Sequence, residues 1–313
     1  MQFACCNPVS SLLASAQIRS PTAGAAPSSS SSWRLPSPRV SPPRSLSPPL
    51  AVFCPCCRPV TKRCLLLGAS TVALPLLPTS PAGARSPSDP DATLKRVHPP
   101  RPDWYEEFYA KEMDQGMKIY ESEVAVYKEK LFTHLSREVS KVLELGVGTG
   151  PNFQYYAGAA DRYIVGVDPN KQMEKYARAS AEAVGLQSSS FSFVKGVGEA
   201  LNVEDNTMDA VIGTLVLCSV SDIALTLREV KRVLKPGGLY LFIEHVAAQD
   251  GSFLRFVQNV LDPLQQFVAD GCHLTRETGK NISEAGFSSV NLQTCFLSSV
   301  SIISPHVYGI ACK

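Results

Sequence analysis

Residues 141–151 read KVLELGVGTGP, and Asp168 ends the next apolar run, 22 residues beyond Gly146. The apolar residues before the glycines suit a buried strand. Gly146, Gly148 and Gly150 then let the backbone turn sharply and approach a ligand closely, because no Cβ stands in the way. A helix that begins directly after them would point its free N–H groups at that ligand, and a second parallel strand would bring the Asp168 carboxylate to a ribose diol. The stretch therefore predicts a nucleoside-binding βαβ unit.

The spacing of the glycines indicates which nucleoside binds. A dinucleotide fold requires G-x-G-x-x-G/A, whereas here Pro151 occupies the third small position and the spacing is G-x-G-x-G, preceded by Glu144. S-adenosylmethionine has no pyrophosphate and carries a sulfonium, an ammonium and a ribose, so carboxylates beside the glycines are electrostatically favourable. We therefore predict S-adenosylmethionine as the cofactor. The alternative, a structural turn with surface acids, does not explain the joint spacing of the glycines and Asp168.

Apolar runs and helical patterns alternate along the rest of the folded part. The runs predict seven strands, at 141–146, 162–168, 191–196, 208–217, 238–246, 288–297 and 300–311. The patterns predict helices at 104–135, from the glycines to about 158, and at 170–184, 221–235, 251–269 and 276–285. The expected fold class is α/β and Rossmann-like, with a seven-stranded, mostly parallel sheet and helices on both faces. The apolar stripe of the first helix either covers the ligand pocket or packs on the sheet.

The amino-terminal residues differ sharply in composition from the rest of the chain. Residues 1–50 contain 13 Ser and 9 Pro, and no Asp or Glu occurs before Asp89. Such a segment cannot bury enough apolar surface to fold, and its Ser-rich, Arg-bearing, acid-free composition is typical of a chloroplast transit peptide. We expect residues 1–84 to be a disordered targeting segment, 85–102 a linker and 103–313 the methyltransferase domain.

A second targeting signal follows within the same segment. Lys62 and Arg63 precede an apolar run at 64–78, and residues 82–84 form an A-x-A processing site. The run is short for a membrane span, which needs about 20 residues. Two signals in series indicate a bipartite route to the thylakoid; one long transit peptide with an apolar patch and a short uncleaved membrane anchor are the alternatives. We predict a chloroplast location, in the stroma or the thylakoid, with the lumen left open.

Charge and cysteine content narrow the function further. Residues 1–84 hold seven of the 30 basic residues and none of the 28 acidic ones, so the remainder carries a formal charge of −5 and shows no basic patch for nucleic acid. Cys54, Cys56 and Cys57 have no second pair of ligand residues at the spacing that zinc sites show. We therefore predict no metal site. The four cysteines of the folded part are expected to be buried free thiols: Cys218, Cys272, Cys295 and Cys312.

Further motifs resemble a known family. The chain resembles class I S-adenosylmethionine-dependent methyltransferases in ELGVGTG at 144–150, VDPN at 167–170, GEAL at 198–201 and LKPGG at 234–238. It looks more narrowly like the methyltransferase-like thiol S-methyltransferases in TLVLCSV at 214–220, EHVAA at 244–248, DGCHLTRE at 270–277 and PHVYGIACK at 305–313. The likeness covers about 104–313 and implies a class I fold and methyl transfer to a thiol. The leader departs from the animal members, which begin with a membrane-anchoring apolar segment.

The resemblance also implies roles for individual residues. It assigns cofactor binding to the ends of the first four strands and the loops after them: Glu144, Gly146, Gly148, Gly150, Asp168, Asn170, Gly198, Glu199 and Leu215. In this assignment Glu144 lies near the ammonium of the cofactor, and Asp168 holds the ribose hydroxyls. Asn170 caps the following helix and borders the adenosine, while Gly198 and Glu199 flank the adenine.

The methyl-transfer reaction requires few contributions from the protein. Displacement of a methyl group from a sulfonium by a sulfur nucleophile needs alignment and exclusion of water. A thiol with a pKa near ~8.5 is partly ionised already, so a weak base suffices. His245 is the candidate for that base or for positioning the thiol, and a buried core histidine is the alternative. Four residues are candidates for the acceptor pocket, or for tying a cap to the sheet: Cys218, Asp270, His273 and Arg276.

The combined expectation is an S-adenosylmethionine-dependent methyltransferase (EC 2.1.1.-) that acts on a small apolar acceptor, with a thiol as the first choice. A quinone, a phenol or another small lipophilic acceptor in the chloroplast is the alternative, and a non-catalytic cofactor-binding scaffold is a further one. The expected partner is a small-molecule acceptor and not a nucleic acid. Peripheral association with thylakoid membranes and the oligomeric state stay open.

Overall fold

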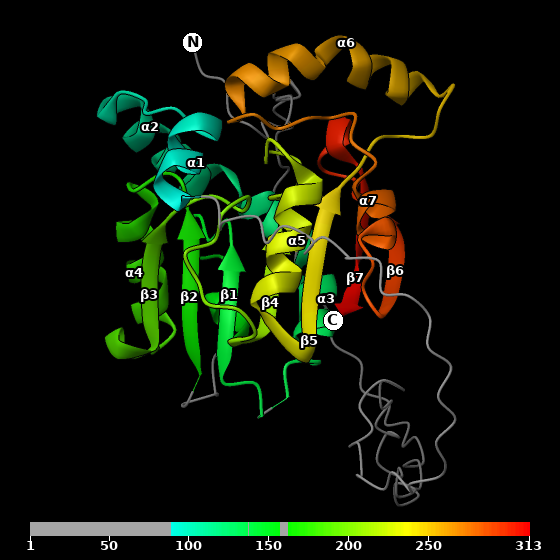
Figure 1. The fold of residues 1–313 in the computed structure, drawn as a ribbon. Coiled ribbons are helices and arrows are strands. Elements are labelled where there is room, and N and C mark those ends of the chain that lie inside the picture. The colour runs from blue at the N-terminus through cyan, green and yellow to red at the C-terminus, as the bar shows by residue number, and fades with distance from the viewer. Residues whose placement is uncertain (1–88, 137, 157–161) are drawn as a thin grey trace, which may run out of the picture. The chain divides into compact units, whose positions relative to one another are not determined.

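A mostly parallel sheet forms the centre of the fold. The computed structural model describes residues 89–313 apart from 137 and 157–161, so the predicted targeting segment 1–84 lies outside the described residues. The sheet order is β3-β2-β1-β4-β5-β7-β6 (Figure 1), with β1 to β5 parallel and β7 antiparallel to both of its neighbours. The strands are β1 (Lys141–Leu145), β2 (Tyr163–Asp168), β3 (Phe191–Lys195), β4 (Met208–Thr214), β5 (Leu234–His245), β6 (Ser289–Phe296) and β7 (Pro305–Cys312). This arrangement confirms the predicted fold class.

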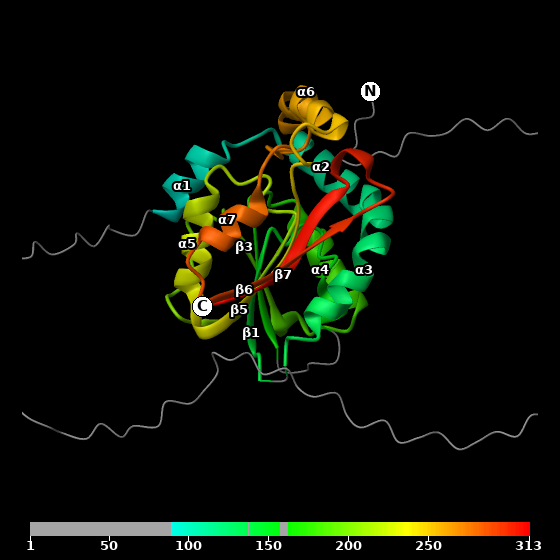
Figure 2. The same ribbon diagram turned by 90° about the vertical axis from the view of Figure 1, so that its right-hand side faces the viewer.

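Helices cover both faces of the sheet. Figure 2 shows α3 (Lys118–Phe132) and α4 (Met173–Ala183) on one side, and α5 (Ile223–Val233) and α7 (Thr278–Glu284) on the other. Each face has its own apolar cluster, and alternate residues of β1 contribute to the two, Val142 on the α3 side and Leu143 on the α5 side. Both faces of β1 are therefore buried, as its apolar residues Val142, Leu143 and Leu145 predict.

Three further helices lie beyond the carboxyl ends of the parallel strands. They are α1 (Pro90–Val97), α2 (Asp103–Gly116) and α6 (Phe253–Val268), which Figure 1 shows above the arrowheads of the strands. The predicted linker at 85–102 thus contains a helix, whose start is capped by the Asp89 side chain accepting from the Asp91 N–H. None of the described helices combines the length and apolarity that a membrane crossing requires.

Local backbone geometry corrects four predicted elements. The predicted helix 104–135 divides into α2 and α3 at Gly116, and the predicted strand 208–217 ends at Thr214 because Leu215 has a φ of 54°. The helix expected after the glycines is, within the described residues, one 3-10 turn at Phe153–Tyr155. The last predicted strand begins only at Pro305, after a 3-10 turn at Ser301–Ile303.

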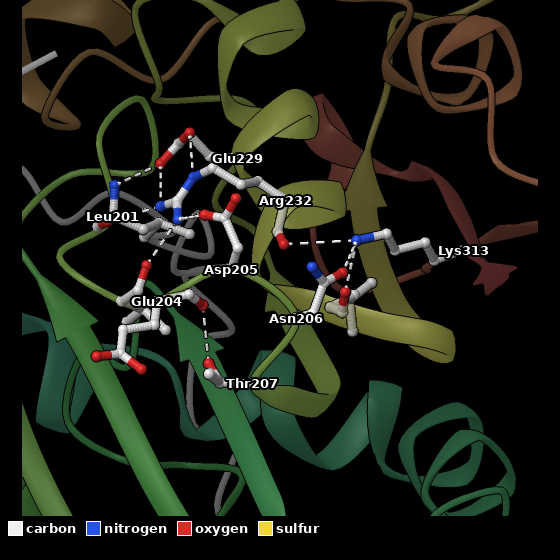
Figure 3. Close-up of polar contacts among 10 residues, drawn as sticks. Leu201, Glu204, Asp205, Asn206, Thr207, Glu229, Arg232 and Lys313 are labelled. Atoms are coloured by element: carbon white, nitrogen blue, oxygen red, sulfur yellow. Dashed lines mark hydrogen bonds and ion pairs between the residues drawn. The ribbon is translucent and has the colours of Figure 1, made fainter. Parts of the chain in front are cut away.

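An ion-pair network holds the loop between β3 and β4 against α5 (Figure 3). The Arg232 guanidinium donates to the Leu201 carbonyl at 2.8 Å and to the Asp205 carboxylate at 2.6 Å, and Glu229 accepts from the Leu201 N–H at 2.9 Å. The carboxyl-terminal Lys313 adds a bond from its Nζ to Asn206 at 2.7 Å. These contacts fix the backbone that continues from residues 196–199, which line the site described next.

Candidate active site

A cavity of about 190 Å³ lies where the carboxyl ends of the central strands meet the cap. Its walls come from the glycine loop after β1, the end of β2, residues 196–199, residues 214–216 and 219–221 after β4, and the helices α1 and α2. In an open α/β sheet, this edge is where ligands bind. Eight predicted site residues line it: Glu144, Gly146, Gly148, Asp168, Gly198, Glu199, Leu215 and Asp270.

The glycine loop has a conformation that side chains disfavour. Gly146, Gly148 and Gly150 have φ angles of 64°, 50° and 82°. A Cβ on Gly148 would find no other heavy atom nearer than the Gly146 carbonyl oxygen at 4.0 Å, so this backbone borders open space. A Cβ on Gly150 would lie 2.5 Å from the ring of Phe153. Gly150 therefore shapes the loop by close packing and does not line the cavity.

Asp168 joins the end of β2 to this loop. Its Oδ2 accepts from the Gly148 N–H at 3.0 Å, and its Oδ1 accepts from the Asn170 N–H at 2.9 Å. Burial raises the pKa of the Asp168 carboxyl to about 7, although the two backbone hydrogen bonds oppose the shift. Each carboxylate oxygen keeps a further lone pair, so Asp168 can still accept from two hydroxyl groups in the cavity.

Asn170 lies next to this carboxylate but outside the cavity wall. Its Oδ1 accepts from the Gln172 N–H at 2.8 Å, and its Nδ2 donates to the Glu106 carbonyl at 2.9 Å. The side chain therefore organises the turn before α4 and connects that turn to α2. The prediction that Asn170 caps the helix is wrong, because Gln172 is the N-cap residue of α4 and no side chain caps this end. Its predicted border with the adenosine stays a prediction.

Glu144 is buried at the end of β1 and positions a neighbour that the sequence analysis missed. Its Oε1 accepts from Asn152 Nδ2 at 2.7 Å, and its Oε2 accepts from the Tyr156 hydroxyl at 2.8 Å. Asn152 also lines the cavity, and its buried Oδ1 has no hydrogen-bond partner among the described residues. The acceptor without a partner beside the glycine loop is thus the Oδ1 of Asn152, whose side chain Glu144 holds in place. Nothing but proximity to the glycine motif marks Asn152 in the sequence.

Replacing Glu144 with glutamine is expected to flatten the pH dependence of stability. Burial raises the pKa of Glu144 from 4.5 to about 7, although bonds from Tyr156 and Asn152 oppose the shift. A carboxyl whose pKa is raised by folding stabilises the fold below its unfolded pKa, and that contribution disappears as the pH rises through 7. Relative to the natural chain, Glu144→Gln should therefore gain about 3 kcal/mol of unfolding free energy between pH 4.5 and 7.

Urea unfolding of the chain without cofactor, at pH values below, within and above that window, measures this difference. Glu182→Gln is the matched control, because Glu182 is exposed on α4 and should leave the pH profile unchanged. A Glu144→Gln difference that stays constant with pH would contradict the assigned burial of the charge.

Glu199 and Leu215 also line the cavity. Glu199 is buried, and its Oε1 accepts from the N–H groups of Ser221 at 2.6 Å and Asp222 at 3.2 Å. Gly198 packs so closely that a Cβ there would lie 2.7 Å from a Thr226 methyl group. The 196–199 backbone is therefore held at α5, and its peptide groups border the cavity beside Glu199.

Asp270 closes the cavity together with the amino-terminal segment. Its carboxylate contacts His98 Nε2 at 3.2 Å and the Arg101 guanidinium at 2.6 Å, and both His98 and Asp270 line the cavity. Burial would raise the pKa of Asp270, but the hydrogen bond and charge of His98, with the charge of Arg101, lower it. The residues before 103 therefore belong to the site and are more than the predicted linker.

Replacing Asp270 with asparagine is expected to weaken cofactor binding about fivefold. Asparagine tolerates the φ of 50° at this position but removes the charge that holds His98 and Arg101, a loss of about 1 kcal/mol. Amide hydrogen exchange in α1 should accelerate while exchange in β1 stays unchanged. Asp250→Asn, which removes an exposed partner of Arg255, is the control. Unchanged exchange in α1 would show that Asp270 does not hold this segment.

The cap helices contribute an apolar wall. Tyr109, Met113 and Met117 line the cavity, whereas Tyr120 and Val124 belong to the core on the α3 face of the sheet. The two interpretations of the predicted stripe therefore both hold, because its residues as far as Met117 line the cavity and those from Tyr120 onward pack on the sheet. The apolar wall leaves this part of the cavity suited to a small apolar molecule.

Four predicted residues lie behind the wall and not on it. The Arg276 guanidinium donates to the Leu217 carbonyl at 2.6 Å, and the His273 N–H donates to the Cys218 carbonyl at 2.9 Å, so both tie the segment after α6 to the loop after β4. His245 and Cys218 are buried, and His245 Nε2 lies 3.2 Å from the Cys272 Sγ. A role of His245 as a base therefore stays a prediction without support from this geometry.

The cavity residues fit S-adenosylmethionine. The unpartnered Asn152 Oδ1 is a suitable acceptor for an ammonium group, and the spare lone pairs of Asp168 suit a ribose diol. The open space beside Gly148 leaves room for the chain between them. Sheet order, glycine loop and acidic residue together define a class I S-adenosylmethionine-dependent methyltransferase, and residues 143–242 match the family described as methyltransferase domain.

Comparison with known proteins narrows the class to a family. The human thiol S-methyltransferase TMT1A is 40% identical over 203 residues, which cover 62% of this chain and 82% of the relative. The rat thiol S-methyltransferase TMT1B is 45% identical over 174 residues, covering 53% and 69%. The chain therefore belongs to the thiol S-methyltransferase family.

The solved structures support the fold alone. A Thermotoga maritima S-adenosylmethionine-dependent methyltransferase, described as a possible histamine N-methyltransferase, superposes with a TM-score of 0.50. The two chains are 21% identical, and the match covers 67% of this chain and 99% of that one. The two chains therefore share the fold.

Proposed function

We propose that this methyltransferase acts on small apolar thiols. The observation that carries the proposal is the identity with thiol S-methyltransferases across most of their length, combined with the apolar cavity wall at Tyr109, Met113 and Met117. When bound, S-adenosylmethionine supplies an electrophilic methyl group on a positively charged sulfur. Transfer of that methyl group to an acceptor thiol would give a thioether and S-adenosylhomocysteine, and the thiol proton would pass to solvent.

The protein contributes binding, orientation and exclusion of water. Asp168 and Asn152 hold the two polar ends of the cofactor, and the 214–216 backbone borders the cavity between them. The contacts of Asp270 with His98 and Arg101 keep the amino-terminal segment over the site. A thiol with a pKa of about 8.5 supplies some thiolate at neutral pH, so alignment in a dry cavity is the main contribution to rate.

An acceptor screen tests the proposal. The purified full chain is incubated with labelled S-adenosylmethionine and matched pairs of thiols and phenols of the same carbon skeleton, together with quinols. We expect labelled thioethers and little product from phenols or quinols. Methylation of phenols or quinols without thiols would replace the thiol by another lipophilic acceptor. Cofactor binding with no turnover on any acceptor would favour a scaffold.

We also propose that α6 rests on a lipid surface. Five large apolar side chains recur along it at steps of three and four and are more than half exposed: Phe253, Phe256, Val260, Leu264 and Phe267. Such a stripe on one face of a helix is typical of binding at a membrane interface. A lipid surface would also concentrate apolar acceptors beside the cap.

Flotation of the full chain with phospholipid vesicles tests this role of α6. The variant Phe253→Ser/Phe267→Ser removes two side chains that are 79% and 81% exposed, and we expect it to lose most of the floated fraction. Phe296→Ser, at 72% exposure on β6, is the matched control and should float like the natural chain. If Phe253→Ser/Phe267→Ser floated as well as Phe296→Ser, α6 would not be the segment that contacts the vesicles. If the double variant floated like the natural chain but lost a dimer that the natural chain forms, the stripe would be a surface for self-association.

For the location in the cell, we propose the chloroplast, on the strength of the composition of residues 1–84. A fluorescent protein fused after residue 84 should accumulate in chloroplasts of transfected leaf cells, and the full chain fused at its carboxyl end should do the same. A cytosolic signal from both fusions would contradict the proposal.

A further inference from the structure

Two cysteines and a histidine from distant parts of the chain meet behind the cavity wall. Cys218 follows β4, His245 ends β5, and Cys272 lies between α6 and α7. One ligand atom from each, the two Sγ atoms and an imidazole nitrogen, lies within 4.8 Å of both others. This cysteine–histidine cluster is the one such group of ligand atoms found in the described part of the chain.

The cluster has the chemistry and the spacing of a zinc site. Thiolate and imidazole are the ligands that zinc prefers, and two Cys with one His is a known donor set. With Zn–S near 2.3 Å and Zn–N near 2.0 Å, tetrahedral ligands lie about 3.5 Å apart. His245 Nε2 and Cys272 Sγ are 3.2 Å apart, so these atoms need to move little to share an ion.

Burial also sets the cluster apart from ordinary surface groups. Cys218 and His245 are each 2% exposed and Cys272 is 8% exposed. The outer nitrogen of His245, Nδ1, is buried and has no hydrogen-bond partner among the described residues. Coordination through Nε2 would offset the loss of water at that nitrogen, which has only a weak contact with a thiol, and would leave the Nδ1–H without an acceptor among the described residues.

We propose that Cys218, His245 and Cys272 bind one zinc ion. Binding replaces the two thiol protons, which pass to solvent, by bonds to the metal, and the neutral imidazole adds the third bond. The fourth position is left to a small ligand such as water. The ion would join the 215–221 loop, the end of β5 and the 269–276 segment. Residues on both sides of Cys218 line the cavity, so the ion would stiffen this wall.

Metal analysis of the purified full chain, prepared anaerobically and without chelator, tests the proposal. We expect about one zinc per chain, and a sulfur-to-cobalt charge-transfer band after replacement with cobalt. Cys218→Ser and Cys272→Ser should weaken zinc binding by more than about 100-fold, because even outer partners of metal ligands are worth 10- to 100-fold. Thermal unfolding should shift down on zinc removal in the natural chain and not in these variants.

The chain offers controls of equal burial. Cys312→Ser matches Cys218 at 2% exposure, and Cys295→Ser matches Cys272 at 8%; both should keep the zinc. A natural chain without zinc, or zinc that survives Cys218→Ser/Cys272→Ser, would overturn the proposal. Copper bound in place of zinc would also overturn the proposal. A metal-free chain in which Cys218 and Cys272 react with alkylating agents only after reduction would overturn it as well, because the two cysteines would then form a disulfide.

Discussion

Replacing Asp168 with alanine is expected to raise the dissociation constant for S-adenosylmethionine about 10- to 100-fold. Hydrogen bonds to a charged group are worth about 1.5–3 kcal/mol, and the variant loses those to the ribose hydroxyls. It also frees the Gly148 N–H, which Asp168 holds at 3.0 Å, so only the Gly146 and Val147 N–H groups still connect the loop to β2, through the Val167 carbonyl. Calorimetric titration of the natural and variant full chains measures the difference.

Asp209 supplies the matched control for this prediction. Its Oδ2 accepts from the N–H groups of Ser140 and Lys141, at 3.0 and 2.8 Å, much as Asp168 accepts from two peptide groups. It lies at the opposite end of β1 and β4 from the cavity. Asp209→Ala should therefore lower the unfolding free energy without changing the dissociation constant. Equal cofactor affinity in Asp168→Ala and the natural chain would remove Asp168 from the site.

Alanine at Gly148 is expected mainly to weaken cofactor binding, whereas alanine at Gly150 is expected mainly to lower the stability of the fold. At Gly148 the new Cβ meets open space inside the cavity, so the fold loses only about 1–2 kcal/mol for the positive φ, while the methyl group occupies space that the cofactor needs. At Gly150 the Cβ would lie 2.5 Å from the Phe153 ring, so overpacking adds to the same strain and stability falls by about 2–5 kcal/mol.

Two measurements on each variant separate these effects. Urea unfolding reports stability, and titration with S-adenosylhomocysteine reports the cofactor site. We expect Gly148→Ala to lose at least about tenfold in affinity, since one badly placed methyl costs more than about 1.4 kcal/mol, and its unfolding midpoint to fall only by what about 1–2 kcal/mol produces. Gly150→Ala should show the larger loss of stability. If Gly148→Ala bound normally, the cofactor would not lie against this stretch of backbone.

The features that could be predicted from the sequence are those whose residues lie close together along the chain. The buried β1 run, the glycines and Asp168 follow one another within 28 residues, and parallel pairing of β1 with β2 brings them together. Asn170 is predicted to cap the next helix from its place just after the strand, but its side chain forms the turn before that helix, whose N-cap residue is Gln172. For such features, local propensity and strand spacing carry most of the information.

The features that it missed depend on contacts between distant segments. Asn152 matters because Glu144 holds it and leaves its Oδ1 free, which no spacing rule reveals. The helix α1 reaches the site through the contact of His98 with Asp270, 172 residues apart. Likewise, Cys218 and Cys272 carry no zinc motif, since 54 residues separate them and only the sheet and cap bring them together.

The division of the predicted 104–135 helix has a similar cause. The apolar stripe continues through Met113, Met117 and Tyr120, so periodicity alone gives one helix. The chain nevertheless breaks at Gly116, and α2 then borders the cavity while α3 packs on the sheet. Glycine has a low helix propensity, so tertiary packing determines that the helix ends at Gly116.

The most direct test of the cofactor site is calorimetry on the full chain with three ligands. The account predicts binding of S-adenosylmethionine and of S-adenosylhomocysteine, each at one site per chain, and no heat with a nicotinamide dinucleotide. Heat from the nicotinamide dinucleotide, with none from either adenosyl compound, would contradict the assignment of the glycine loop and Asp168 to an adenosyl sulfonium.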